Sequence, residues 1–230
     1  MRKAVFNWSG GKDSALALQK VLLEKEYDVI SLLTTIDRAA NASTLHAIPV
    51  SILEAQAASL GIPLYIVNLN FKLQDDQHEM LQAIDHFKDL SVTHFIFGDI
   101  FLDYVKTYRE GKLNPSGIEV VMPLWGKSSE VVMTEFLESG IQAKIIVTDA
   151  SKLDESFIGK QLTRSLIDSF PPEIDCCGEL GEYHTLAFDG PIFKNKVDFE
   201  IEATKKLSHD IGIDDGTTKQ FNYWRAMIKA

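Results

Sequence analysis

One run near the start of the chain decides its fold: Ser9-Gly10-Gly11-Lys12-Asp13-Ser14. Residues 4–8 before it are largely apolar and predict a short strand, while residues 15–23 after it place apolar side chains at helical spacing. Glycines at a strand-to-helix junction let the backbone turn sharply and bring its N–H groups close to a ligand. Because the first turn of a helix leaves N–H donors unpaired and its dipole favours negative charge, the run predicts an anion site.

The spacing of the glycines separates this run from two other phosphate-binding loops. It has neither the Gly-x-x-x-x-Gly-Lys-Ser/Thr spacing nor the Gly-x-Gly-x-x-Gly spacing. The hexapeptide resembles the PP-loop of the ATP pyrophosphatases, enzymes that split ATP into AMP and pyrophosphate. The resemblance implies that residues 9–14 hold the pyrophosphate, that Lys12 and Asp13 take part in catalysis, and that Mg²⁺ bridges the phosphates with Asp13 as a ligand.

Strand and helix patterns alternate through the first 125 residues, which predicts an α/β fold with a doubly wound parallel sheet, Rossmann-like in its ligand site. The expected strands are residues 4–8, 29–36, 64–69, 93–97 and 118–122, and the expected helices begin at Lys12 and then cover 48–60, 74–90 and 102–112. In such sheets a ligand binds beyond the carboxyl ends of the strands, where the strand order reverses. The residues that follow the strands are therefore expected on one edge: 9–14, 34–37, 98–99 and 123–125.

The rest of the chain has a mixed pattern and predicts a smaller α+β domain. The expected helices are 128–139 and most of 155–169, and the expected strands are 143–148, 184–188, 196–205 and 221–228, with a turn at 210–218. We therefore divide the chain into an ATP-binding domain at residues 1–125 and a substrate-binding C-terminal domain at residues 126–230.

Residues that follow the expected strands complete the predicted nucleotide site. Thr34 to Ile36 end the second strand near the expected adenine position, and His46 lies in the polar loop 38–47 that faces it. The expected ATP-binding residues are Ser9, Gly10, Gly11, Lys12, Asp13, Ser14, Thr34, Thr35, Ile36, His46, Gly98 and Asp99.

A second polar cluster, residues 177–185, holds two glycines, two carboxylates, a tyrosine and a histidine. Beside a PP-loop, this cluster resembles the Gly-Glu-x-Gly-Glu-Tyr-x-Thr motif of diphthine–ammonia ligase and its relatives. Three further segments match that family: Gly98-Asp99-Ile100 with Tyr104 and Arg109 after it, Pro123-Leu124-Trp125, and Leu153-Asp154 with Phe157-Ile158-Gly159. The resemblance covers residues 4–193, nearly the whole chain.

What this resemblance implies is ATP-dependent amide synthesis. Transfer of AMP to a carboxylate creates a mixed anhydride, which ammonia attacks; in the ligase the acid belongs to diphthine, a modified histidine of translation elongation factor 2. Glu182 is expected to hold or deprotonate ammonium. The substrate-binding residues implied are Tyr104, Arg109, Glu179, Glu182, Tyr183, His184 and Thr185.

The sequence departs from the better-known members of that family at three places: Asp99, Cys177 and His184. These departures indicate a related branch of the family. The resemblance therefore supports the amidoligase chemistry more strongly than it supports diphthine as the substrate. A small free acid, with its carboxylate held by Arg109, is the alternative acceptor.

Composition excludes several other classes of function. A net charge of -10 argues against a nucleic-acid partner, and no apolar run reaches the roughly 18 residues that span a membrane. The adjacent Cys176 and Cys177 indicate reduced thiols and, with no signal-peptide pattern, a cytoplasmic protein. Two alternatives stay open: a PP-loop enzyme that modifies tRNA, and a nucleotide-sensing protein without turnover. Assembly into a homo-oligomer is also left open.

Overall fold

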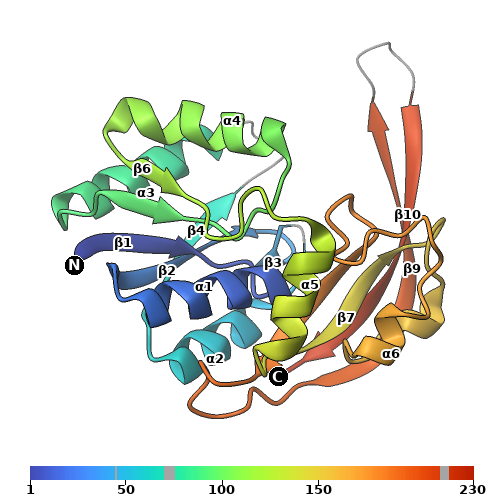
Figure 1. Cartoon of the computed structure of the whole chain (residues 1–230). Helices are drawn as coiled ribbons and strands as arrows, with labels where there is room; N and C mark the ends of the chain where they lie inside the picture. Colours follow the sequence, from blue (N-terminus) through green and yellow to red (C-terminus); the bar gives the residue numbers. More distant parts are fainter. Residues whose placement is uncertain (45, 70–75, 213–217) are drawn as a thin grey trace.

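The chain folds around two β-sheets, one in each half, as the computed structural model in Figure 1 shows. The structure describes residues 1–44, 46–69, 76–212 and 218–230. The first two residues of the helix expected at 74–90, and most of the turn expected at 210–218, lie outside these described ranges.

The first sheet is built from parallel strands. Its members are β1 (Arg2–Asn7), β2 (Tyr27–Asp37), β3 (Ala42–Ser43), β4 (Leu64–Leu69), β5 (His94–Ile96) and β6 (Glu119–Val121). The parallel strands lie in the order β4-β2-β1-β5-β6, and β3 pairs antiparallel with the end of β2. The chain first builds outward from β1 through β2 to β4, then returns to β5 on the other side of β1. The strand order therefore reverses between β1 and β5, where a ligand site is expected.

Helices cover both faces of this sheet (Figure 1), so the predicted doubly wound α/β class is confirmed. Helices α1 (Lys12–Glu24) and α2 (Val50–Leu60) lie on one face, and α3 (Asp76–Asp89) and α4 (Asp103–Leu113) lie on the other. Strand β1 feeds both cores because successive side chains of a strand point to opposite faces. Phe6 joins the hydrophobic cluster of α1 and α2, and Val5 joins the cluster that contains Phe87 of α3.

The second sheet is antiparallel, in the order β8-β7-β10-β9. Its strands are β7 (Gln142–Asp149), β8 (Tyr183–Asp189), β9 (Glu200–Gly212) and β10 (Thr218–Lys229), and the β9–β10 ribbon projects beyond the body of the molecule in Figure 1. This half also contains α5 (Ser129–Glu138), α6 (Arg164–Ile167) and the 3-10 turn η2 (Glu155–Phe157), while η1 (Asn114–Ser116) follows α4. Ser128 caps α5 by accepting a hydrogen bond from the Val131 N–H at 3.4 Å.

One hydrophobic cluster runs through both halves, from α1 and α2 to Phe136 of α5 and the apolar side chains of β7 and β8. A domain division between residues 125 and 126 therefore stays a prediction. Among the described residues, no helix is long and apolar enough to cross a membrane.

The helix expected over most of residues 155–169 is wrong. Only the turn η2 and the single-turn α6 are helical there, because the segment between them pairs with β7. The Gly159 N–H donates to the Ile145 carbonyl at 2.8 Å, and the Leu162 N–H donates to the Ala143 carbonyl at 2.9 Å. Pairing with a strand distant in the sequence has outweighed the local helical pattern.

Candidate active site

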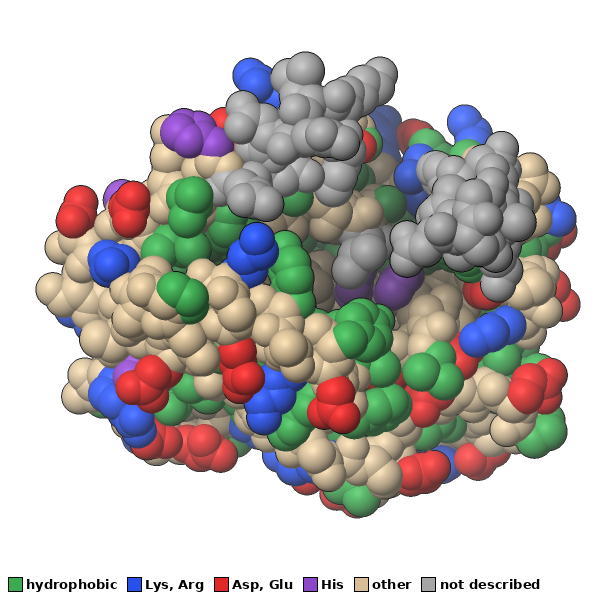
Figure 2. All heavy atoms as spheres, turned by 90° about the horizontal axis from the view of Figure 1, so that it is seen from above, with side chains coloured by type: hydrophobic (Ala, Val, Ile, Leu, Met, Phe, Trp, Pro, Cys, Tyr) green, Lys and Arg blue, Asp and Glu red, His purple; other side chains and the backbone are tan. Residues whose placement is uncertain are grey.

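A cavity of about 910 Å³ lies beyond the carboxyl ends of the parallel strands, between the loops of the first half and residues 177–185 of the second. Figure 2 looks down on this face and shows the surface hollowed in its middle. The volume is near the upper end of the range for small-molecule sites. Of the expected site residues, the lining contains Ser9, Lys12, Asp13, Ser14, Thr34, Thr35, His46, Gly98, Asp99, Tyr104, Arg109, Glu179, Tyr183, His184 and Thr185.

Gly10 and Gly11 shape the loop from beneath and are not part of the cavity lining. Gly10 has a φ of +82°, and a Cβ there would lie 2.7 Å from Ile48. A Cβ on Gly11 would lie 2.7 Å from the ring of His46. Ile36, expected near adenine, is buried in the hydrophobic cluster because its apolar side chain packs away from the polar edge. Ile36 therefore packs in the core, and the two glycines, which have no side chain, shape the loop itself.

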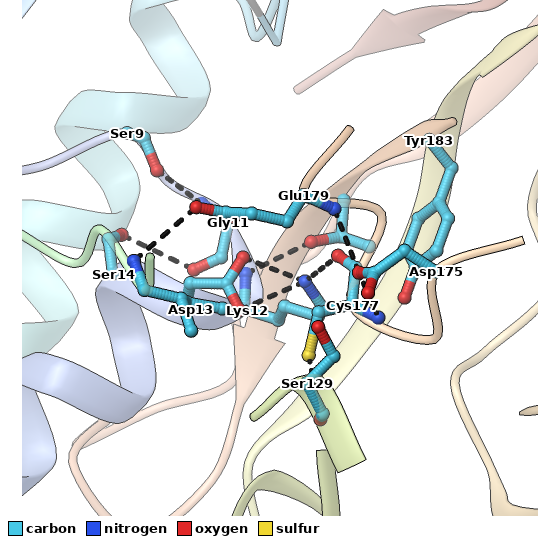
Figure 3. Close-up of polar contacts among 12 residues, drawn as sticks. Ser9, Gly11, Lys12, Asp13, Ser14, Ser129, Asp175, Cys177, Glu179 and Tyr183 are labelled. Carbon is cyan, nitrogen blue, oxygen red and sulfur yellow. Dashed lines mark hydrogen bonds and ion pairs between the residues drawn. The ribbon is translucent and has the colours of Figure 1, made fainter. Parts of the chain in front are cut away.

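Lys12 is buried beneath the cavity and held by three oxygen atoms (Figure 3). Its Nζ lies 2.9 Å and 2.7 Å from the two carboxylate oxygens of Asp13 and donates to the Cys177 carbonyl. Burial by itself would lower the pKa of Lys12, but the Asp13 carboxylate and other nearby groups outweigh it and raise that pKa. The ammonium group is therefore charged at the N-terminus of α1.

The loop and β8 are joined by hydrogen bonds between residues far apart in the sequence. The Lys12 N–H donates to Thr185 Oγ1 at 3.0 Å, and His46 Nδ1 lies 3.3 Å from the Thr185 carbonyl. The His46 and His184 rings stack with their centroids 4.7 Å apart. Burial lowers the pKa of His184 to about 3 and also lowers that of His46. Both imidazoles are therefore neutral at neutral pH.

Arg109 is engaged by a carboxylate of the same cavity. Its Nε lies 2.6 Å and its Nη2 3.0 Å from the two oxygens of Asp99, and its guanidinium lies 4.0 Å from the centroid of the Phe97 ring. This bidentate pair neutralises the cation that a small free acid would need. The alternative acceptor therefore loses the residue that favoured it.

Both carboxylate oxygens of Asp13, the expected Mg²⁺ ligand, face Lys12 in this structure, and its role as a metal ligand stays a prediction. Among the described residues, no group of three or more His, Cys, Asp or Glu side chains could hold a metal ion. A metal would therefore need further oxygen ligands from a bound substrate.

Glu182 is not among the residues that line the cavity, so its expected contact with substrate or ammonia has no support in this arrangement and stays a prediction. The residue is fully buried, and its Oε1 lies 3.2 Å from Lys152 Nζ and accepts from the Asp175 N–H at 3.4 Å. Its Oε2 is buried without a hydrogen-bond partner. A buried carboxylate needs a compensating cation, and Lys152, which is not among the residues that line the cavity, supplies it.

Two polar residues that the sequence interpretation missed hold the site together. Asp175 Oδ1 accepts hydrogen bonds from the N–H groups of Cys177 at 3.0 Å and Glu179 at 3.1 Å, which folds residues 175–179 into a tight turn. Gln56, fully buried on α2, donates to the carbonyls of Gly10 at 3.0 Å and Ala187 at 2.6 Å. In the sequence, the position of Gln56 on the apolar face of a helix could have indicated a buried hydrogen-bonding role.

The two cysteines are not arranged as reactive thiolates. Cys177 is buried, its Sγ donates to the Ser129 carbonyl at 3.2 Å, and burial raises its pKa. Burial also raises the pKa of Cys176. Since thiolates are the reactive form, this arrangement does not favour sulfur transfer.

Comparison with known proteins gives a consistent family assignment. The profile of the diphthamide synthase N-terminal domain matches residues 1–119, and that of the diphthamide synthase C-terminal domain matches residues 128–219. A diphthine–ammonia ligase of Danio rerio is 26% identical over 225 residues, which is 87% of this chain and 87% of that protein. The enzyme of the same name from Homo sapiens is 31% identical over 128 residues, 54% of this chain and 47% of its own.

Among solved structures, a U34-tRNA thiolase from Methanococcus maripaludis is 18% identical and covers 60% of this chain and 56% of its own. The TM-score of this comparison is 0.37.

Proposed function

This chain belongs to the diphthamide synthase family, and from that premise we propose that it is an ATP-dependent ligase that converts a carboxylate into an amide with ammonia. A carboxylate oxygen of the acceptor attacks the α-phosphorus of ATP, and the bond to pyrophosphate breaks. Ammonia then attacks the activated carbonyl, AMP leaves, and one proton is released. The observation that carries the proposal is the charged, buried Lys12 at the N-terminus of α1, beside a cavity that is large enough for more than one ligand.

Several contacts support triphosphate binding on residues 9–14. The hydroxyl-bearing Ser9 and Ser14 line the same cavity as Lys12. Gly98 allows the β5–α4 loop to approach α1 closely. A Cβ on Gly98 would lie only 3.0 Å from the Ser14 backbone. Lys12 would stabilise the charge that develops on the departing pyrophosphate, a role typically worth two to three orders of magnitude in rate. Thr34, Thr35 and the stacked pair of His46 and His184 would lie beside the adenosine.

Mg²⁺ would enter this site with the nucleotide. The phosphate oxygens would supply most of its ligands, as is common where Mg²⁺ binds with a substrate. The described residues offer no preformed cluster for it. When bound, the ion would neutralise phosphate charge; Lys12 and Asp13 would fix the loop around it.

Diphthine on translation elongation factor 2 is the acceptor that the family relationship favours, since the curated relatives carry the name diphthine–ammonia ligase. Two tyrosines on α4, Tyr104 and Tyr108, are 72% and 66% exposed at the rim of the cavity. Exposed aromatic side chains at a rim would suit contact with a protein and with the quaternary ammonium group of diphthine. Asp99 neutralises the cation that a small acid would use.

The test incubates the protein with ATP, Mg²⁺, ammonium and an elongation factor that carries diphthine. Equal amounts of AMP, pyrophosphate and amidated factor are expected, and omission of ammonium should stop amide formation. ATP hydrolysis to ADP, or AMP release that does not depend on the factor, would contradict the proposal.

A further inference from the structure

Three carboxylates line the cavity within the described residues, and only two of them have a cation. Asp13 is paired with Lys12 at 2.7 Å, and Asp99 is paired with Arg109 at 2.6 Å. Glu179 has neither Lys nor Arg within ion-pairing distance. One oxygen of Glu179 accepts a single hydrogen bond, from the Ile100 N–H at 3.3 Å. An uncompensated carboxylate that faces a ligand cavity is free to take up a positive charge or a proton.

The position of Glu179 is fixed from both sides. The Asp175 carboxylate holds its backbone N–H at 3.1 Å, and the loop after β5 holds its side chain through Ile100. Figure 3 shows the side chain extended across the loop that carries Lys12 and Asp13. The carboxylate is therefore presented beside the residues that would hold the phosphates of ATP.

The surroundings of Glu179 favour its protonated form more than those of an ordinary glutamate. Burial raises its pKa to about 7, with a further rise from Asp13 and a smaller one from Asp99, while Lys12 and the Ile100 N–H act in the opposite direction. A base with a pKa close to the working pH is suited to proton transfer.

We propose that Glu179 is the catalytic base of the second half-reaction, the group that takes the proton from the attacking ammonia, and this inference rests on the proposed ligase function. The ammonia nitrogen forms a bond to the activated carbonyl carbon, and the bond from that carbon to the AMP oxygen breaks. Glu179 accepts the proton that the nitrogen loses and later releases it to solvent.

The other titratable groups of the cavity are less suited to this role. Asp13 and Asp99 are committed to cations. The lowered pKa values of His46 and His184 make both imidazoles weak bases. Tyr183 already donates its hydroxyl hydrogen to the Cys176 carbonyl at 2.5 Å.

The experiment separates the two half-reactions in the Glu179→Gln variant. Exchange of labelled pyrophosphate into ATP, with diphthine-bearing elongation factor and without ammonium, measures activation of the carboxylate. Product mass with ammonium measures amide formation. Hydroxylamine replaces ammonium in a third assay, because it is largely unprotonated at neutral pH and attacks without a base. Glu173→Gln is the matched control, since Glu173 is exposed on the same segment and outside the cavity lining.

We expect Glu179→Gln to keep wild-type exchange and hydroxamate formation but to lose amide formation by about 10²–10⁴-fold, the usual contribution of a general base. The Glu173→Gln control should retain all three activities. Equal loss of amide and hydroxamate, with exchange intact, would show that Glu179 orients the acceptor and would overturn its role as a base. Loss of pyrophosphate exchange in Glu179→Gln would place Glu179 in the nucleotide site and would also overturn its role as a base. A wild-type protein without acceptor-dependent exchange would instead refute the ligase function itself.

Discussion

Residues 9–14 and residues 177–185 form two walls of one cavity, but they are built in different ways. The first wall is a local structure: a strand, a tight glycine turn and a helix that begins at Lys12. The second wall depends on distant partners, because the Asp175 turn is tied to Glu182, and Glu182 is tied to Lys152 on another loop. The main-chain turn of the first wall, which we call the nucleotide wall after its proposed ligand, is therefore encoded largely by a short sequence, although Thr185 and Gln56 hold it in place. The second wall, which we call the acceptor wall after its proposed ligand, needs the fold of the second half. Substitutions that affect one wall and not the other test this difference.

The largest effect is expected at the nucleotide wall, from Lys12→Ala. Removal of the ammonium group takes away the charge that would stabilise departing pyrophosphate, so AMP formation should fall by about 10²–10³-fold. That loss of rate corresponds to about 2.7–4 kcal/mol of activation free energy. The free energy of unfolding should change by much less than this. The measurement is acceptor-dependent AMP release, compared with urea unfolding of the same variant. Lys20→Ala is the control, because Lys20 lies on the same helix and pairs with Glu135 away from the cavity. Undiminished AMP release in Lys12→Ala would remove Lys12 from the mechanism.

The acceptor wall should respond to a change outside the cavity, Lys152→Ala. This substitution leaves the buried Glu182 carboxylate without its cation, and we expect the free energy of unfolding to fall by about 1–3 kcal/mol. Urea unfolding gives this value, and ATP affinity, measured by calorimetry, should stay near that of the wild type.

A double substitution sharpens the same prediction. In Lys152→Ala with Glu182→Gln, the uncompensated charge is gone, so the combined loss of stability should be smaller than the sum of the two single losses. A strictly additive result would mean that the pair does not interact. An equal loss of ATP affinity in Lys152→Ala would contradict the separation of the two walls.

A smaller effect is expected where the β5–α4 loop packs against α1. Two glycine substitutions, one at this contact and one away from it, test whether close packing is needed there. A Cβ on Gly98 would lie 3.0 Å from the Ser14 backbone, whereas a Cβ on Gly111, inside α4, would meet nothing within 4 Å. Gly98→Ala should weaken ATP binding and lower stability by about 1–3 kcal/mol. Gly111→Ala should raise stability by roughly 0.5–1 kcal/mol, since alanine favours a helix over glycine. Similar effects of the two substitutions would show that Gly98 is not needed for close packing.

The junction between the two walls should give stability a gradual dependence on pH. His184 has a pKa of about 3 in the folded chain against an ordinary value of 6.5, so between these values the unfolded chain binds a proton that the folded chain does not. Stability should therefore fall as the pH drops from about 6.5 toward 3, with His184 contributing at most about 1.4 kcal/mol per pH unit. His184→Phe keeps a ring beside His46 and should flatten this dependence. The measurement is the unfolding midpoint of both proteins at several pH values between neutral and acidic. The same dependence on pH in His184→Phe and in the wild type would mean that His184 is already charged in the folded chain.

The sequence predicted the parts of the site whose form is set by neighbours in the chain. The strand-to-helix turn at residues 9–14, the parallel alternation and the convergence of residues 98–99 on the same edge all depend on local periodicity. Glu182 shows why the rest was not predictable: it lies three residues from Glu179 in one motif, yet one carboxylate faces the cavity and the other is buried against Lys152. Which glutamate faces the ligand depends on partners about thirty to eighty residues away, and these partners leave no spacing signal. The segment 159–162 was missed for the same reason, because it pairs with β7.

The most direct test of the account follows one oxygen atom. If the acceptor carboxylate is labelled with heavy oxygen and incubated with the protein, ATP, Mg²⁺ and ammonium, the proposed attack on the α-phosphorus makes that oxygen the bridge to AMP. After ammonia displaces AMP, mass spectrometry should find one heavy oxygen in the phosphate of AMP for each amide formed. Heavy oxygen in inorganic phosphate with formation of ADP, or unlabelled AMP alongside the amide, would contradict activation of the carboxylate by adenylation.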